Sequence, residues 1–386
     1  MNADELDDVN FDEEIDELGT IGAITAVVQG TDWTTETVVS QMQRGNIVLN
    51  PTFQRRDAWN KRRKSLLIES LIVGLPVPQL VLAESKRDAG KFLVLDGKQR
   101  LLSILQFWGE APPGPNNGFS LSSLQLRPAL SRKTFAQLSS DPKLESDYNS
   151  LCNHTIRTMV IRGWKTDDLL HAIFLRLNTG SVTLSPQELR QALYPGSYTT
   201  YVDQASADSK ALQRLLRLKG PDPRMRDAEI LARYLAFRFF ISKYPGRMKK
   251  FLDDSFKTFN DEWRDYQPLV EEAVEDFNDG TEKLLSLFDG RPARKPGSAQ
   301  FNRAIFDALI FYQSNKGIRK AVGNKKAALK REYKALFTGS SDFGDAVESD
   351  TAGTPNTFTR LRIWASALSK ITGKKITAPR RPLAVD

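Results

Sequence analysis

The sequence predicts an α+β fold in which a small mixed N-terminal domain is followed by an all-α domain. Strand signals occur only before about residue 200, where short apolar stretches are bounded by Gly and Pro. Beyond that point the pattern is helical, as in "DAEILARYLAFRFFISKY" and "AQFNRAIFDALIFYQSN". We therefore expect an acidic disordered arm over residues 1–25, the mixed domain over 26–198 and the helical domain over 199–386.

Composition excludes several classes of protein. No apolar run approaches the roughly 20 residues that span a bilayer. The N-terminus has neither the basic nor the apolar segment of a signal peptide, so we expect a cytoplasmic protein with no membrane partner. Cys152 is the only cysteine, which excludes an intrachain disulfide and a multi-cysteine metal site.

Charge is unevenly distributed along the chain. The formal net charge is +8, although residues 1–20 carry nine acids and no base. The most basic stretch runs from Arg291 to Lys334, with twelve bases against two acids. The basic charge of the chain after residue 20 favours DNA or nucleotides as partners. A role of this charge in solubility alone is an equally acceptable interpretation.

The mixed domain begins with two helices. "TDWTTETVVSQMQRG" predicts a helix that starts near Thr34 or Thr35 and ends at Gly45. "NIVLNPTFQRRDAWN" is extended and broken by Pro51, and it leads into the helix "KRRKSLLIESLIVG", which Gly74 ends.

Two strands and a helix follow. "LPVPQLVLAE" and "KFLVLD" predict the strands, and the next helix carries an apolar stripe that should pack on them, formed by Leu101, Ile104, Leu105 and Trp108. Residues 110–150 are rich in Pro, Gly, Asn and Ser, which predicts an insertion with weak structure of its own.

The mixed domain closes with a strand and two helices. "HTIRTMVIRGW" predicts the strand and "TDDLLHAIFLRLNTG" a helix. In "LSPQELRQALY", Ser185, Pro186 and Glu188 have the spacing of a capping box at the start of another helix.

The stretch "FLVLDGKQRLLSILQFW" runs from a strand through an Asp-Gly turn directly into a helix. A helix start offers unpaired N–H groups and partial positive charge, which suit phosphate, and Gly97 lets an anion approach closely. Consecutive residues splay about 100° apart on a helix, so three neighbours cannot all reach one group. We assign Arg100 to phosphate, Gln99 to a water or base edge, Lys98 to the rim, and Asp96 to Mg²⁺ or a ribose hydroxyl.

An ordinary turn with a solvated first helical turn is the alternative interpretation. A second Gln-Arg pair, Gln54 and Arg55, precedes it in an extended segment, and two such pairs could bind phosphate from two sides. For Arg55 and Arg56, a solvated basic surface that continues into residues 61–64 is an equal alternative.

Three segments together resemble the N-terminal (GmrS-like) domain of GmrSD-type restriction endonucleases, a family similar in fold to ParB and sulfiredoxin. They are "PTFQRRDAWNKRRKSLLIESLIVGLPVPQLVLAE", "LVLDGKQRLLSILQF" and "IFLRLNTGSVTLSPQELRQAL", in the family's order and spacing. The resemblance runs over roughly residues 30–195. The later segments "MRDAEILARYLAF", "NRAIFDAL" and "TRLRIWASAL" resemble the helical region that often follows.

The resemblance implies nucleoside triphosphate binding and hydrolysis with Mg²⁺, in defence against phage DNA. The family's Asp-Gly-Gln-Gln-Arg motif falls on residues 96–100 of this chain. Lys98 stands at the third position of the motif, which is usually Gln, and adds a cation. We predict catalytic roles for Asp96, Gln99 and Arg100, Mg²⁺ binding by Asp96, and nucleotide contacts from Gln54, Arg55, Gly97, Lys98 and Asn178.

Two other functions stay open. Asp96 and Lys98 could bind Mg²⁺ and activate water in a direct nuclease, with Glu84 or Asp88 as second acid. A non-catalytic DNA-binding adaptor would instead use the basic stretch 291–334. Many relatives carry a C-terminal HNH nuclease, which two histidines cannot form, so DNA cleavage falls to this fold or to a separate nuclease subunit.

Overall fold

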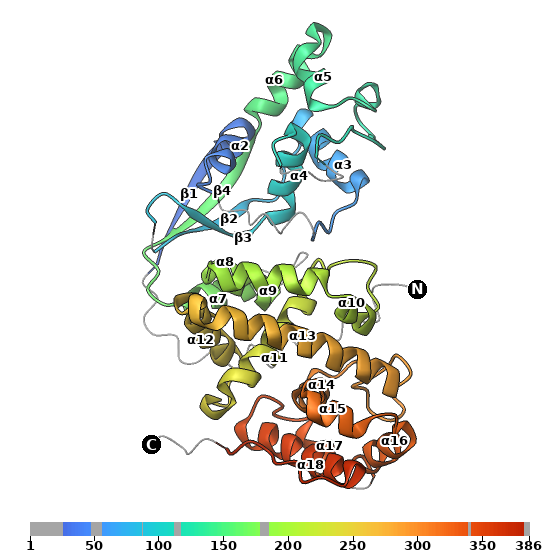
Figure 1. Cartoon of the computed structure of the whole chain (residues 1–386). Coiled ribbons are helices and arrows are strands. Elements are labelled where there is room, and N and C mark those ends of the chain that lie inside the picture. The colour runs from blue at the N-terminus through green and yellow to red at the C-terminus, as the bar shows by residue number, and fades with distance from the viewer. Residues whose placement is uncertain are drawn as a thin grey trace. The chain divides into compact units, whose positions relative to one another are not determined.

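The computed structural model describes residues 26–47, 56–86, 88–111, 117–177, 185–338 and 341–381, without the side chains of residues 171 and 174–177. The predicted arm and three predicted site residues, Gln54, Arg55 and Asn178, lie outside these ranges. The chain divides into two compact units, of which one ends at Leu193 and the other begins at Tyr194. We call them the N-terminal unit and the helical unit (Figure 1).

No helix in these ranges combines the length and the apolar character needed to cross a membrane.

The N-terminal unit contains a four-stranded mixed sheet with the order β1-β4-β2-β3. Its strands are β1 (Val27–Thr34), β2 (Leu80–Glu84), β3 (Phe92–Asp96) and β4 (Thr155–Arg162). β4 pairs antiparallel with β1 and parallel with β2, and β2 pairs antiparallel with β3. The sequence did not indicate β1, because Gly30 and Asp32 interrupt its apolar pattern.

Helices cover both faces of this sheet. Alternate residues of β2 point to opposite sides: Leu80 and Leu82 belong to one apolar cluster, whereas Val81 and Ala83 belong to another. The first cluster includes α2 (Thr35–Gln43), α3 (Lys61–Ile72), α4 (Lys98–Trp108) and α6 (Glu145–Asn153); the second includes α7 (Asp167–Leu177) and α8 (Pro186–Leu193). The predicted packing of the α4 stripe on the strands is confirmed.

The predicted helix boundaries of this unit hold where capping chemistry defines them. Thr34 caps α2, since its Oγ1 accepts the amide of Thr37 at 3.2 Å. Ser185 and Glu188 form the expected capping box at α8, with Ser185 Oγ accepting the Glu188 amide at 3.2 Å and Glu188 Oε2 accepting the Ser185 amide at 2.7 Å.

The prediction of weak structure in residues 110–150 is wrong. This region forms two 3₁₀ turns (Pro128–Leu130 and Pro142–Leu144), the helix α5 (Phe135–Ser140) and α6. Its aromatic side chains pack on the end of α4, where the rings of Trp108 and Phe135 stack with centroids 4.4 Å apart. Widely spaced aromatic and leucine residues thus anchor a segment whose local composition is typical of loops.

Glu69 of α3 also holds this region in place. Its carboxylate accepts the amides of Gln125 at 3.0 Å and of Leu126 and Arg127 at 2.7 Å. Burial raises the pKa of Glu69, but the three amide donors outweigh it, and the net pKa is lowered. The ionised carboxylate is therefore part of the fold.

All regular elements described in the helical unit are helices, as predicted, and they enclose one large apolar cluster. The α-helices are α9 (Ser197–Asp208), α10 (Lys210–Leu216), α11 (Arg226–Phe240), α12 (Met248–Asp261), α13 (Trp263–Leu287), α14 (Arg303–Gln313), α15 (Lys316–Val322), α16 (Lys326–Ala335), α17 (Asp342–Ala346) and α18 (Thr354–Thr372).

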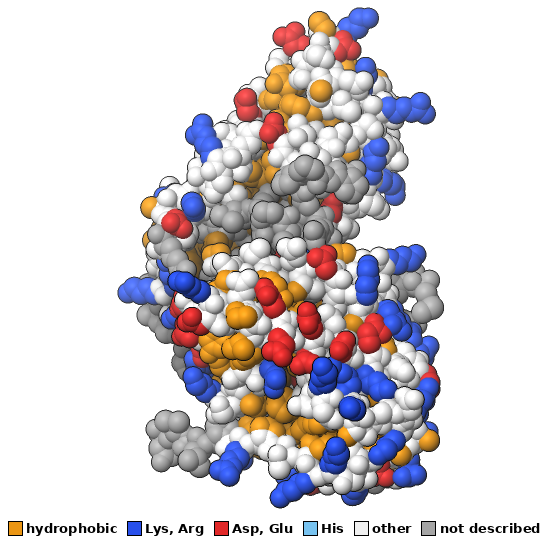
Figure 2. All heavy atoms as spheres, in the orientation of Figure 1, with side chains coloured by type: hydrophobic (Ala, Val, Ile, Leu, Met, Phe, Trp, Pro, Cys, Tyr) orange, Lys and Arg blue, Asp and Glu red, His pale blue; other side chains and the backbone are white. Residues whose placement is uncertain are grey.

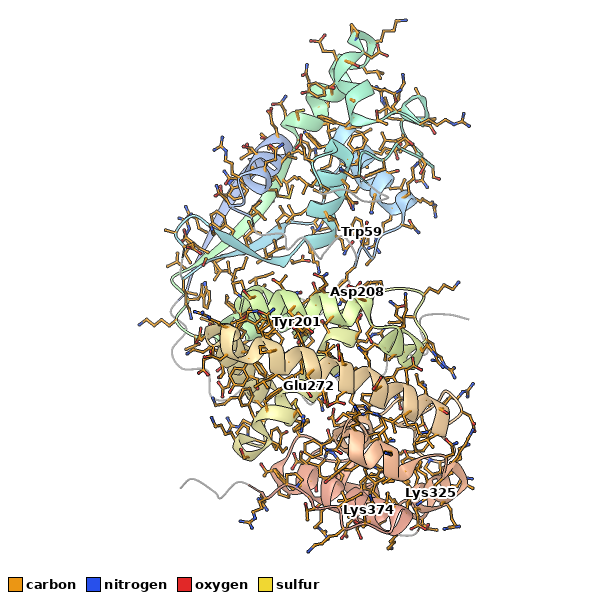
Figure 3. All side chains as sticks on the ribbon, viewed as in Figure 1. Trp59, Tyr201, Asp208, Glu272, Lys325 and Lys374 are labelled. Carbon is orange, nitrogen blue, oxygen red and sulfur yellow. The ribbon has the colours of Figure 1, made fainter. Side chains whose placement is uncertain are left out.

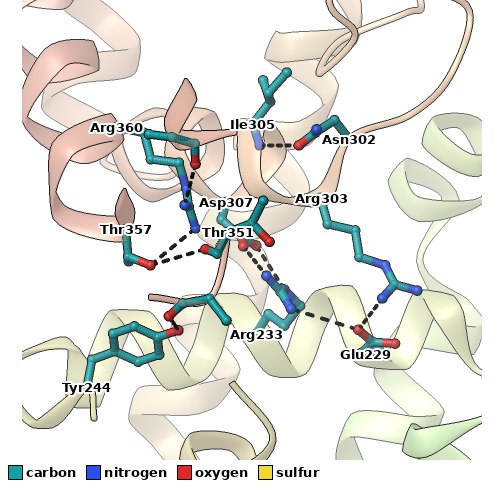
Figure 4. A network of polar contacts seen from close by, with 12 residues as sticks. Glu229, Arg233, Tyr244, Asn302, Arg303, Ile305, Asp307, Thr351, Thr357 and Arg360 are labelled. Atoms are coloured by element: carbon teal, nitrogen blue, oxygen red, sulfur yellow. Dashed lines mark hydrogen bonds and ion pairs between the residues drawn. The ribbon is translucent and has the colours of Figure 1, made fainter. Parts of the chain in front are cut away.

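A buried polar network joins two of the helical segments singled out in the sequence. Arg233 NH2 of α11 lies 2.5 Å from Asp307 Oδ2 of α14, and Arg303 NH1 lies 2.9 Å from Glu229 Oε1 (Figure 4). Burial lowers the pKa of Arg233, but the negative charges of Asp307 and Glu229 raise this pKa by a larger amount. The guanidinium therefore stays charged.

The third segment contributes Arg360 of α18, which is 1% exposed. Its NH1 donates to the carbonyl of Ala346 at 3.0 Å and its NH2 to Thr357 Oγ1 at 3.3 Å (Figure 4). The patterns "MRDAEILARYLAF", "NRAIFDAL" and "TRLRIWASAL" therefore supply internal polar contacts of the helical unit.

Candidate functional site at the start of helix α4

Strand β3 enters helix α4 through Gly97, as the sequence predicts. Gly97 has φ 101° and ψ 6°, in the left-handed region. A β carbon at this position would lie 2.3 Å from Leu80 Cδ2 of the neighbouring strand, so only glycine fits without displacement. Because Gly97 has no side chain, it cannot cap the first amides of α4 as Thr34 does for α2.

Asp96 spans the turn. Its Oδ1 accepts the amide of Gly97 at 2.7 Å, and its Oδ2 lies 2.8 Å from Arg100 NH2. Both carboxylate oxygens of Asp96, the residue predicted to bind Mg²⁺ or a ribose hydroxyl, thus have partners within the turn. The side chain of Asp96 is 26% exposed to solvent.

Arg100 is buried beside the helix start, with its side chain 10% exposed. Its NH1 donates to the carbonyls of Pro78 and, at 3.1 Å, of Gln79. A guanidinium has five N–H donors. Within the described residues, the three bonds leave the Nε–H and one N–H of NH2 of Arg100 without an acceptor.

Lys98 does not lie at a rim as assigned. It is 5% exposed, and its Nζ lies 2.7 Å from Oε1 of Glu188 in α8, which is 6% exposed. The extra cation is thus matched by a carboxylate 90 residues later in the chain. The sequence signalled Glu188 only as a capping residue, because nothing in the local pattern connects it with Lys98.

Gln99 is half-buried, and its Oε1 accepts the amide of Ala58 at 3.3 Å. This bond joins the first turn of α4 to the segment before α3. The next residue, Trp59, is labelled in Figure 3, and the guanidinium of Arg63 lies 4.3 Å from its ring centroid. Among the described residues, the buried Trp59 Nε1 has no hydrogen-bond partner.

The interpretation of the upstream bases as solvated surface is wrong for two of them. Arg56 and Lys64 are each 1% exposed. Lys64 Nζ forms an ion pair with Asp57 Oδ2 and donates to Gln106 Oε1 of α4 at 2.8 Å. Lys64 lies on the apolar stripe of α3. Its burial could have been predicted from this position in the helix.

Glu84, one of the two carboxylates proposed as second acid of a nuclease, also has internal partners. Glu84 Oε1 accepts the amide of Gly90 at 3.2 Å, and its Oε2 lies 3.4 Å from Arg162 Nε. Among the described residues, no group of three or more His, Cys, Asp or Glu side chains is arranged to hold a metal ion.

Residues 35–195 match the family model described as "GmrSD restriction endonuclease, N-terminal domain". Over these residues the chain is similar to the GmrSD N-terminal domain family, as the sequence predicts. The match covers α2 to α8, including the GmrSD motif at Asp96–Arg100, and the family context is restriction and defence against phage. No curated protein and no solved structure matches the chain.

Proposed function

We propose that the GmrSD domain binds a nucleoside triphosphate at the start of α4 and couples its binding and hydrolysis to DNA sensing or restriction. The observation that carries this proposal is the geometry of Gly97 and Arg100: a helix start whose N-cap glycine has a positive φ and no capping side chain, with a buried guanidinium beside it. We propose with it, from the motif resemblance, that the four-stranded sheet belongs to a ParB/sulfiredoxin-like fold.

Phosphate oxygens suit this position for electrostatic reasons. The helix dipole and the first amides of α4 favour an anion, and the two remaining N–H donors of Arg100 add charge-assisted hydrogen bonds. The bond from Asp96 to Arg100 fixes the guanidinium before a ligand arrives, which reduces the entropy lost on binding.

Asp96 is a suitable Mg²⁺ ligand, because Mg²⁺ on a nucleotide takes one or two carboxylates and otherwise phosphates and water. The ion would supply charge neutralisation of the phosphates. Gln99 has an amide that can orient water, and Gln54, Arg55 and Asn178 would complete the nucleotide contacts. DNA cleavage would fall to a separate nuclease subunit or to this chain.

The proposal is tested by calorimetric titration of the full chain with ATP, GTP, CTP and UTP in Mg²⁺. We expect saturable binding of at least one of them, and at least a tenfold loss of affinity in Arg100→Ala. Arg62→Ala is the matched control, because Arg62 is exposed on α3, and its affinity should stay unchanged.

Arg100→Ala also removes bonds to the 78–79 segment, so its melting temperature is measured without nucleotide, and Arg100→Lys is compared. Absence of binding to all four triphosphates, or equal affinity of wild type and a folded Arg100→Ala, would overturn the proposal. Phosphate release with and without DNA then tests hydrolysis and its coupling.

A further inference from the structure

Half of the bases in the stretch 291–334 of the helical unit have a carboxylate partner. Six of its twelve bases lie within 4.0 Å of a carboxylate, namely Lys295, Arg303, Arg319, Lys326, Lys330 and Arg331. Lys326 and Lys330 share Asp289, and their hydrogen bonds lower its pKa to about 2. Lys325, labelled in Figure 3, donates to the carbonyl of Ile371 at 3.1 Å. Net sequence charge therefore does not identify a binding surface here.

Arg291 and Arg294 differ from these paired bases. Both lie in the loop between α13 and α14, and neither has a carboxylate partner among the described residues. Arg294 Nε donates to the carbonyl of Ala299 at 2.6 Å and its NH1 to that of Pro292 at 3.1 Å. Uncharged acceptors thus fix the guanidinium while leaving its charge uncompensated, and three of its five N–H donors remain.

The backbone around Arg294 is held as well. Its carbonyl accepts Tyr333 Oη at 2.8 Å, and the buried Ala293 accepts the Asn302 amide at 2.9 Å. Burial lowers the pKa of Arg294, and repulsion from Arg217 and Arg291 lowers it further. Contacts between α10 and α13 bring the two segments together, because Ser209 Oγ lies 2.6 Å from Asn278 Oδ1 and Arg214 pairs with Glu282. Arg217 directly follows α10, and the loop with Arg291 and Arg294 follows α13, so the three positive groups interact unfavourably.

Left-handed backbone accompanies this cluster. Of the seven described non-glycine residues with positive φ, three lie in its two segments: Arg217 (φ 56°), Asp289 (φ 53°) and Ala293 (φ 57°). Such conformations cost of order 1 kcal/mol each and concentrate at functional sites. Arg217 ends α10 in this conformation, and the other two fold the loop that carries Arg291 and Arg294.

We propose that Arg217, Arg291 and Arg294 form a phosphate-binding site for the backbone of duplex DNA. A fixed guanidinium between two exposed ones fits phosphodiester oxygens, and a phosphate would relieve the repulsion within the cluster. The helix α13 is rich in acidic side chains, and Figure 2 shows acidic side chains in a row across this unit with basic ones at one end; the acidic row would repel DNA. The choice of DNA rests on the proposed role in restriction.

The test measures binding of the full chain to a fluorescent 30-base-pair duplex across a series of salt concentrations. Arg217→Gln/Arg291→Gln removes two charges and leaves the bonds of Arg294 intact. About 0.9 counterions are released per contacted phosphate, so we expect the salt slope to fall by about 2. The matched control, Lys326→Gln/Lys330→Gln, removes the same charge from two lysines that share the carboxylate of Asp289, and should change the slope by less than about half as much.

Equal slopes for the two double variants, or no change in the arginine variant, would overturn the site. Tighter binding of a matched RNA duplex would overturn the assignment to DNA. If Arg217→Gln/Arg291→Gln does not fold, the single variant Arg291→Gln is measured in its place, and its salt slope should fall by about 1. Nucleotide affinity at α4 is measured separately on each variant, so failure of this site and failure of the nucleotide proposal are distinguishable.

Discussion

Lys98 and Glu188 form a buried ion pair, with Nζ and Oε1 2.7 Å apart, that ties the start of α4 to the start of α8. The second oxygen of Glu188 accepts the amide of Ser185, so one carboxylate both caps a helix and balances a buried cation. The lysine that distinguishes this chain from the usual GmrSD motif therefore has a structural partner next to the candidate site.

Replacing Lys98 by Ala should lower the free energy of unfolding by about 3–5 kcal/mol, because it leaves a buried carboxylate without its cation. Lys98→Gln should cost less, since an amide can still donate to Glu188. Urea unfolding of both variants checks this order, with the exposed Arg62→Ala expected within about 0.5 kcal/mol of wild type. Equal losses for Ala and Gln would contradict the importance of a donor at this position.

Glu69→Gln should change how stability depends on pH. A carboxylate whose pKa is lowered by folding stabilises the protein above its unfolded pKa, near 4.5, and loses that contribution as pH falls through the folded value. At pH 7 the substitution should cost about 1–3 kcal/mol, and between about pH 5 and 3 the variant should lose less further stability than wild type. Unfolding curves that stay parallel over this range would contradict the assignment.

Gly97→Ala and Gly109→Ala form a matched pair at the two ends of α4. Both glycines have positive φ, 101° and 78°, but an added β carbon clashes with Leu80 only at Gly97. Gly109→Ala should cost about 1 kcal/mol, whereas Gly97→Ala should cost clearly more and abolish nucleotide binding. Thermal unfolding measures the loss of stability, and calorimetry measures the loss of nucleotide binding. Similar losses of stability in Gly97→Ala and Gly109→Ala would show that the Leu80 side chain moves aside at little energetic cost.

Arg233 and Asp307 allow a double-mutant cycle in the helical unit. Each single change, Arg233→Met or Asp307→Leu, should cost about 3–5 kcal/mol, because it leaves one buried charge unpaired. The double variant should recover part of this loss. A strictly additive double variant, measured by urea unfolding, would show that the pair is not energetically coupled.

The sequence predicted those features that local chemistry determines. The Thr34 cap, the Ser185 capping box and the Gly97 turn each depend on residues within a few positions, and the structure has all three. Features that depend on distant partners were missed or misassigned. Lys98 was placed at a rim because Glu188 lies far along the chain, and residues 110–150 were expected to be weakly structured because their anchors lie on α3 and α4.

The pairing of β1 with β4 bears on how this domain can be produced in isolation. The two strands align over their full length, from Val27 opposite Arg162 to Thr34 opposite Thr155, whereas the family match begins one residue later, at position 35. A fragment trimmed to the matched range would strip the partner from β4 and leave its N–H and C=O groups as a template for intermolecular pairing. Expression from residue 26 retains that strand and should yield the less aggregation-prone sample.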